Sequence, residues 1–235
     1  MHEIVNHPAD LKPLFAAHQV CVCKLQMSWL NAGGSLQPWG LEKLYDVAYS
    51  NQGGEWNDWA RNWTLAKPSF IQLIAETNAT VLILGRDLTK EEDLQPLIAS
   101  GNIVSHEKAL WRDFLKLIEQ SRSLVTFNVH DASPRVLAEA MCMDVPVLIN
   151  WHILGGWKYA TEQTGEDFVD TASFIQAYKR LREPERQARL RPRQWYRYQI
   201  IAPTCVFEQV TPSAQLHLSQ PSVNHGQNCA RKCLT

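Results

Sequence analysis

The stretch 123–168 constrains the fold more than any other part of the chain, because its hydrophobic pattern changes repeatedly over a short distance. It opens on residues 124–129, a short apolar and β-branched run that is typical of a buried strand. A polar break leads to Pro134, which suits the first turn of a helix, and good helix formers follow over 135–143. A second apolar run covers 145–149, and a loop with two adjacent glycines comes after it. The pattern predicts a strand, a helix, a second strand and a loop.

Two buried strands joined by a helical crossover pair in parallel, with a right-handed connection. Ligands of such sheets bind beyond the carboxyl ends of the strands, which places residues 130–133 and 150–158 on one rim. The predicted helix begins beside the same rim. Its unpaired N–H groups and the positive end of its dipole favour an anion there.

The motif in this stretch resembles a known family. Asp131 is followed, after seven residues, by Glu139 within the letters E-A-M, and then by a Pro-Val strand at 145–147. This resembles the E-x7-E signature of retaining GT-B glycosyltransferases, in the half that binds the nucleotide sugar. The segments DASPRVLAEAM, ILGGWKY and TGEDF are more similar still to a group of such transferases from algae and large algal viruses. The resemblance covers residues 45–198.

The resemblance implies an α/β fold, namely a Rossmann-like, doubly wound parallel sheet that forms one half of a GT-B fold. It also implies a nucleoside-diphosphate sugar as donor and a sugar acceptor of unknown identity. Such enzymes commonly work without a metal, and the resemblance implies no other cofactor. We therefore expect no metal site and no cofactor.

By resemblance, Glu139 corresponds to the glutamate that accepts hydrogen bonds from the donor ribose, and Asp131 to the acidic catalytic residue near the donor sugar. A basic residue after the first strand would hold the diphosphate, and both Arg61 and Lys67 fit that place. Structural roles compete with these. Asp131 could instead cap the helix, and Glu139 could instead pair with Arg135 one turn earlier.

Further donor-binding candidates lie on the predicted rim. His130 either contacts the sugar or is a plain loop residue, and Lys158 reaches either a phosphate or solvent. Small or polar residues at the helix start and in the second loop would let the ligand approach the backbone closely; these are Ser133, Asn150, Gly155 and Gly156.

Outside this stretch, apolar runs at 45–50 and 80–84 predict two more strands. The amphipathic run 109–120 predicts a helix with Arg112, Lys116 and Glu119 on its solvated face. Tryptophans at spacings of three and four predict one helical face packed against the core; they are Trp56, Trp59 and Trp63. The arginine-rich segment 186–197 is interpreted as a solvated helix face rather than a nucleic-acid surface.

Composition excludes some classes of partner. The net charge of −1 over 235 residues gives no whole-protein field for nucleic acid or membrane surfaces. The six cysteines lack the paired C-x-x-C spacing of zinc or redox sites, so we expect reduced thiols. No stretch of eighteen apolar residues is present in the sequence. We therefore expect no nucleic acid partner, no membrane span and a location in the cytoplasm.

The domain organisation follows from these patterns. Residues 1–44 are expected to be a short N-terminal segment, 45–199 the donor-binding domain, and 200–235 a disordered or divergent tail. Forty-four residues are too few to build the acceptor-binding domain of a GT-B enzyme. The expectation is a glycosyltransferase represented mainly by its donor-binding half; the alternative is a non-catalytic nucleotide-sugar-binding or interaction module. Both readings predict that the chain binds the donor, and only the first predicts turnover. For the isolated chain we expect turnover no faster than slow hydrolysis.

Overall fold

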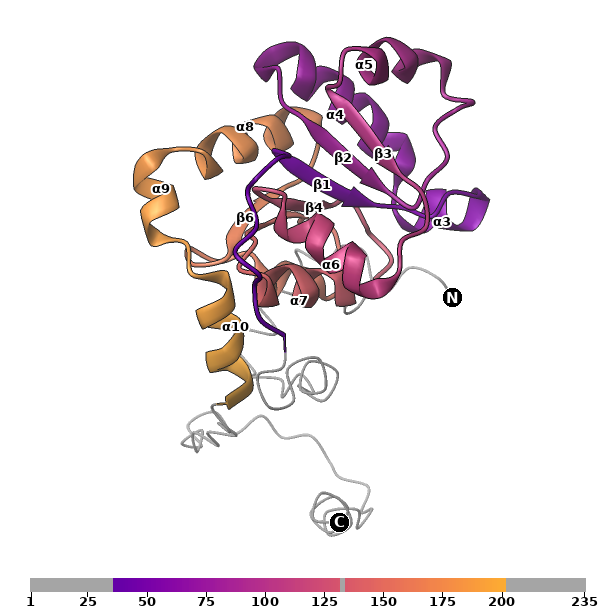
Figure 1. The fold of residues 1–235 in the computed structure, drawn as a ribbon. Helices are drawn as coiled ribbons and strands as arrows, with labels where there is room; N and C mark the ends of the chain where they lie inside the picture. The colour runs from indigo at the N-terminus through magenta and orange to yellow at the C-terminus, as the bar shows by residue number, and fades with distance from the viewer. Residues whose placement is uncertain (1–35, 132–133, 202–235) are drawn as a thin grey trace, which may run out of the picture. The chain divides into compact units, whose positions relative to one another are not determined.

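The computed structural model describes residues 36–131 and 134–201. Within these residues the core is a sheet of six strands, all parallel, in the order β3-β2-β1-β4-β5-β6 (Figure 1). The strands are β1 (Val47–Ser50), β2 (Val81–Leu84), β3 (Ile103–His106), β4 (Leu124–Thr126), β5 (Val147–Asn150) and β6 (Gly165–Phe168).

Helices cover both faces of this sheet (Figure 1). They are α3 (Glu55–Ala60), α4 (Trp63–Thr77), α5 (Gln95–Ala99), α6 (Trp111–Glu119), α7 (Arg135–Cys142), α8 (Thr171–Leu181), α9 (Pro184–Arg189) and α10 (Pro192–Ile201), with short 3-10 helices η2 (Glu92–Leu94) and η3 (Gly156–Tyr159). Side chains of α4 and α8 form one buried cluster, and side chains of α6, α7 and α10 form the other. The strands alternate between the two, since Val81 and Ile83 join the first cluster while Leu82 joins the second.

The predicted parallel pairing of the two central runs is confirmed. Leu124 pairs with Val147 and Thr126 with Ile149, in parallel register. Strand β4 ends at Thr126, earlier than the apolar run, and residues 127–131 continue as a loop at the carboxyl edge. The predicted strand was too long because residues after Thr126, such as Phe127, are buried in the loop as completely as the residues of the strand.

The chain order reverses between β1 and β4. Strand β1 pairs with β2 on one side and with β4 on the other, so the connections that leave β1 and β4 diverge at this point. In open α/β sheets the crevice at such a switch point, beyond the carboxyl ends of the strands, is where ligands bind.

The tryptophan prediction is wrong for two of its three members. Trp63 is buried, but Trp56 and Trp59 are 71% and 58% exposed. The reason is a break in the helix: α3 ends at Ala60, α4 begins at Trp63, and Asn62 between them has a left-handed φ of 54°. One continuous helical face therefore does not exist.

Two predicted solvated faces also need correction. Glu119 is 2% exposed, because its carboxylate accepts the backbone N–H groups of Trp39, Gly40 and Leu41 at 2.9, 2.7 and 3.1 Å. Arg186 is largely buried, with Nε 2.5 Å from a carboxylate oxygen of Glu166. In both cases the charge satisfies groups from another part of the chain, which helical spacing does not reveal.

Most of residues 1–44 and of the tail 200–235 lie outside the described residues, and so do the predictions made for them. Of the helices that the structure describes, none combines the length and the apolar character needed to cross a bilayer.

Candidate functional site

Charged and aromatic side chains from two connections meet beyond the carboxyl ends of β1 and β4, and we call this place the switch-point crevice. Arg61, in the turn after α3, pairs with Asp131, in the loop after β4; Nη1 and Oδ2 are 3.5 Å apart. Asn128 donates from Nδ2 to the same oxygen of Asp131 at 3.3 Å. Both charged side chains are about one third exposed, so the pair lies open to a ligand. Asp131 precedes the N-cap of α7, which is Pro134.

A second contact joins the same two connections. The rings of Trp59 and His130 are stacked, with centroids 4.0 Å apart and planes 10° apart. The structure thus brings together three predicted residues, Arg61, His130 and Asp131. It adds Trp59, which sequence reasoning assigned to the core. The polar residues among its neighbours at 55–58 were the sequence signal that this segment is exposed.

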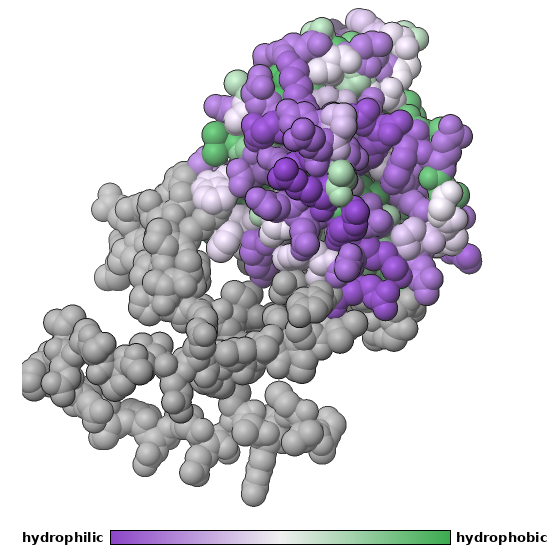
Figure 2. Space-filling model, turned by 90° about the vertical axis from the view of Figure 1, so that its left-hand side faces the viewer, coloured by the Kyte–Doolittle hydropathy of each residue, from purple (hydrophilic) through white to green (hydrophobic). Residues whose placement is uncertain are grey.

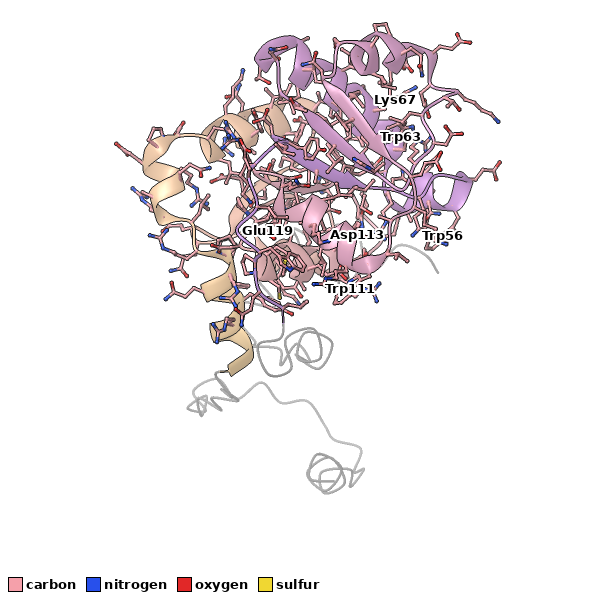
Figure 3. All side chains as sticks on the ribbon, in the orientation of Figure 1. Trp56, Trp63, Lys67, Trp111, Asp113 and Glu119 are labelled. Atoms are coloured by element: carbon pink, nitrogen blue, oxygen red, sulfur yellow. The ribbon has the colours of Figure 1, made fainter. Side chains whose placement is uncertain are left out.

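The structure separates Lys67 from this group. Its Nζ lies 3.2 Å from Glu91 and 2.8 Å from Asp93, both in the connection after β2. The hydrogen bond to Asp93 is the main reason that the pKa of Lys67 is raised. Figure 3 labels Lys67 on α4, one turn after Trp63, whose indole N–H donates to Glu91 at 3.2 Å. Of the two candidate cations, Arg61 is the one paired across the crevice.

Arg86 follows β2 and organises the wall beside the crevice. Its guanidinium pairs with Asp58 of α3 and with Glu91 at 2.5 Å, and it lies over the ring of Trp63, 4.3 Å from the centroid. It is 8% exposed. The side chain therefore fixes α3 and the connection after β2 to each other.

Glu139 lies in α7 and is 3% exposed. Its Oε1 accepts the indole N–H of Trp111 at 2.8 Å and lies 3.4 Å from Nε of Arg135. Burial raises the pKa of Glu139, although the hydrogen bond from Trp111 and the charge of Arg135 oppose the shift. The pairing with Arg135 was one of the two predicted possibilities. The contact with Trp111, the half-exposed first residue of α6 (Figure 3), was not predicted.

The loop after β5 closes the site on the far side of β4. Buried Asn150 donates from Nδ2 to the carbonyl of Phe127 at 3.1 Å and accepts the backbone N–H of His152 at 3.0 Å. The N–H of Gly155 donates to the carbonyl of Asp131 at 3.4 Å. Asn150 and Gly155 therefore tie this loop to the loop that carries Asp131.

The remaining candidates are Gly156, Lys158 and Ser133. A Cβ on Gly156 would lie 2.9 Å from Ile153 and 3.2 Å from Pro134, so this glycine allows the loop to pack against the start of α7. Burial lowers the pKa of Lys158. Its Nζ lies 5.2 Å from the ring centroid of Tyr159. Ser133 lies outside the described residues. Among the side chains that the structure describes, no group of three or more His, Cys, Asp or Glu could hold a metal ion.

Similarity to solved structures agrees with this architecture. The pneumococcal O-GlcNAc transferase GtfA in complex with UDP and GlcNAc superposes with a TM-score of 0.54 at 16% identity. A mutant of TarM from S. aureus, in complex with Fondaparinux, alpha-GlcNAc-glycerol and UDP, gives 0.53 at 11%. The sucrose-phosphate synthase of Thermosynechococcus elongatus gives 0.51 at 15%. The chain has the fold of one half of a GT-B protein.

The extent of these matches limits what they show. They cover 71%, 70% and 67% of this chain but only 34%, 34% and 42% of the matched ones. No protein-family model and no curated protein matches the chain. The similarity therefore shows the fold, and the chemistry must be argued from the residues at the crevice.

Proposed function

We propose that the chain binds a nucleoside-diphosphate sugar in the crevice between the connections after β1 and β4, as the donor-binding half of a retaining glycosyltransferase. One observation carries the proposal: Arg61 and Asp131 face each other across the switch point at 3.5 Å, beside the stacked Trp59 and His130. A partly exposed cation at the position where α/β sheets bind ligands suits a diphosphate.

The chemistry of glycosyl transfer explains why both charges belong there. Breaking the bond between the anomeric carbon and the phosphate leaves negative charge on the diphosphate, while positive charge develops on the sugar. Arg61 would bind the diphosphate, with about 1.5–3 kcal/mol for each hydrogen bond to a charged group. Asp131, released from Arg61 by the incoming phosphate, would lie near the sugar and stabilise its developing charge. The positive end of the α7 dipole also lies beside the leaving group.

Glu139 is the proposed acceptor for the ribose hydroxyls of the donor. As the second carboxylate of the motif it would accept the ribose hydroxyls, yet its Oε1 accepts the N–H of Trp111 in this structure. Donor binding therefore requires Trp111 to share Glu139 with the ribose or to turn outward. Trp111 has room to turn because it is half exposed at the start of α6.

The solved structures suggest which donor to test first. Two of the similar proteins were solved with UDP bound, one of them together with GlcNAc and the other with a GlcNAc-glycerol. We therefore take UDP and UDP-GlcNAc as the first probes, with GDP for comparison.

The two candidate cations provide matched variants for the test. Titration calorimetry of the full chain with UDP should show saturable binding that Arg61→Gln weakens by about tenfold or more. Lys67→Gln removes the same charge but should leave the affinity within about threefold, because Lys67 is committed to Glu91 and Asp93. Equal losses in both variants, or no saturable binding of UDP or GDP to the parent, would contradict the proposal.

A turnover assay then separates the two functional classes. Release of UDP from UDP-GlcNAc, with and without saccharide acceptors, reports transfer or hydrolysis. Binding without acceptor-dependent turnover favours the non-catalytic nucleotide-sugar-binding module, and acceptor-dependent turnover favours the transferase.

A further inference from the structure

A cavity lies at the opposite end of the sheet from the proposed donor site. It has a volume of about 500 Å³, within the size range of small-molecule sites. Its walls come from residues just before β1, β4 and β5 and from the segment that links α8, α9 and α10; the lining residues are Lys43, Arg122, Asp144, Pro146, Arg182, Pro184, Gln187, Leu190 and Pro192. Figure 2 views the molecule from the side of α8 and α9 and shows hydrophilic residues over much of that face.

The cavity wall is basic. Lys43, Arg122 and Arg182 contribute three positive charges, and Asp144 is the single acidic residue of the lining. The carboxylate of Asp144 accepts the backbone N–H of Arg193 at 3.1 Å. Its negative charge therefore lies at the start of α10. Two cations of the wall share one further carboxylate: Oδ1 of Asp46 lies 3.7 Å from Nε of Arg122 and 3.2 Å from Nη1 of Arg182.

This arrangement leaves donors without carboxylate partners. A guanidinium carries five N–H groups, and Arg122 and Arg182 each have one ion pair with the same oxygen of Asp46. Lys43 donates only to neutral carbonyls, those of Glu119 at 2.6 Å and Ser121 at 3.0 Å. Its positive charge therefore lacks a contacting carboxylate in the described part of the chain. Burial lowers the pKa of Lys43, against the charge of Glu119.

The segment 179–193, which contributes to the cavity wall, also has a net positive charge. Residues 179–193 contain seven basic and two acidic residues, a net charge of +5 in a chain whose total is −1. Pro192, the first residue of α10, is part of the wall, so the positive end of that helix dipole lies at the cavity. Of the basic residues in this segment, Arg182 lines the cavity, together with Lys43 and Arg122 from the sheet edge.

We propose that this cavity is a binding site for a small phosphate-bearing anion, separate from the donor site. Guanidinium groups match the geometry of phosphate oxygens, and Arg122 and Arg182 are held close together because both contact Asp46. Lys43 adds a third charge from a half-buried position. The phosphate can belong to a soluble compound or to a phospholipid head group, and the two sources share the same chemistry.

The test is a titration of inorganic pyrophosphate into the full-length Arg61→Gln variant, in which the donor crevice is weakened as a competing site; the variants below are made in this background. We expect saturable binding that Arg122→Gln and Arg182→Gln each weaken by about tenfold or more. Arg180→Gln is the matched control, because Arg180 is also at the end of α8 and also has one carboxylate partner, Glu166, but does not line the cavity. It should change the affinity by less than about threefold, the effect of a general loss of charge. Thermal unfolding of each variant identifies any that fail to fold.

Flotation with vesicles distinguishes the two sources. Phosphatidylcholine vesicles with and without phosphatidic acid are added to the parent and to the same variants. Flotation that depends on phosphatidic acid and on Arg182 assigns the phosphate to a lipid head group; pyrophosphate binding without flotation assigns it to a soluble compound. Equal losses in Arg180→Gln and Arg182→Gln, or neither pyrophosphate binding nor flotation, would overturn the proposal.

Discussion

At the scale of single residues, the carboxylates of the motif have different surroundings. Asp131 is partly exposed and paired with Arg61, while Glu139 is buried beneath Trp111. The sequence predicted that His130 and Asp131 lie on the rim, and the resemblance implied a cation after the first strand, either Arg61 or Lys67. It could not predict the partners of each side chain. Trp111 and Glu139 are 28 positions apart and meet only because α6 and α7 pack on the same face.

The buried carboxyl of Glu139 leads to a prediction about pH and stability. Its pKa is raised in the folded protein, so the folded state holds this proton more tightly than the unfolded chain does. That contribution favours folding at low pH and is lost as the pH rises through the folded pKa, leaving a buried charge at neutral pH. Glutamine has the same shape and can accept the N–H of Trp111 without ionising. Glu139→Gln should therefore raise the melting temperature at pH 7.

Thermal unfolding measured across pH checks this sign. The advantage of Glu139→Gln should shrink as the pH is lowered through the raised pKa of Glu139, because the parent carboxyl then takes up its proton. A variant less stable than the parent at pH 7 would show that the ion pair with Arg135 outweighs burial. In that case UDP binding by the variant would still report on the ribose contact separately.

At the scale of elements, the connections after the strands are held by charge networks that the hydrophobic pattern does not encode. Apolar runs predicted four of the strands of the sheet, namely β1, β2, β4 and β5. The break between α3 and α4 was missed because it depends on Asn62 taking a left-handed conformation, which asparagine tolerates better than most residues. That break exposes Trp59 and turns it toward His130.

The ion pairs of Arg86 with Asp58 and Glu91 should stabilise the fold measurably. Arg86→Met should lower the free energy of unfolding by about 2–4 kcal/mol, since it removes the buried cation that Asp58 and Glu91 share and leaves Glu91 paired with Lys67. The loss falls on Asp58 and Glu91, of which Glu91 is the more buried. Urea unfolding measures it. Lys179→Met is the control: it breaks the exposed pair with Glu76 and should cost about 1 kcal/mol or less. Similar losses in the two variants would mean that the Arg86 network does not fix α3.

At the scale of the whole molecule, the parallel sheet separates two polar sites. The crevice with Arg61 and Asp131 lies beyond the carboxyl ends of the strands, and the basic cavity with Lys43, Arg122 and Arg182 lies at their amino ends. The sequence predicted the carboxyl rim, since the residues after each apolar run identify it. The amino-end cavity was not predicted, because its cations come from three segments that are far apart in the sequence.

We propose that a nucleoside diphosphate binds in the crevice at the switch point between β1 and β4. Backbone amide NMR of the ¹⁵N-labelled full chain during a UDP titration tests it most directly, because each amide reports its own site. The account predicts saturable shifts concentrated in residues 51–61, 127–135 and 150–158, with those around 182–190 unchanged. Shifts confined to the amino-end cavity, or none at saturating UDP, would contradict it.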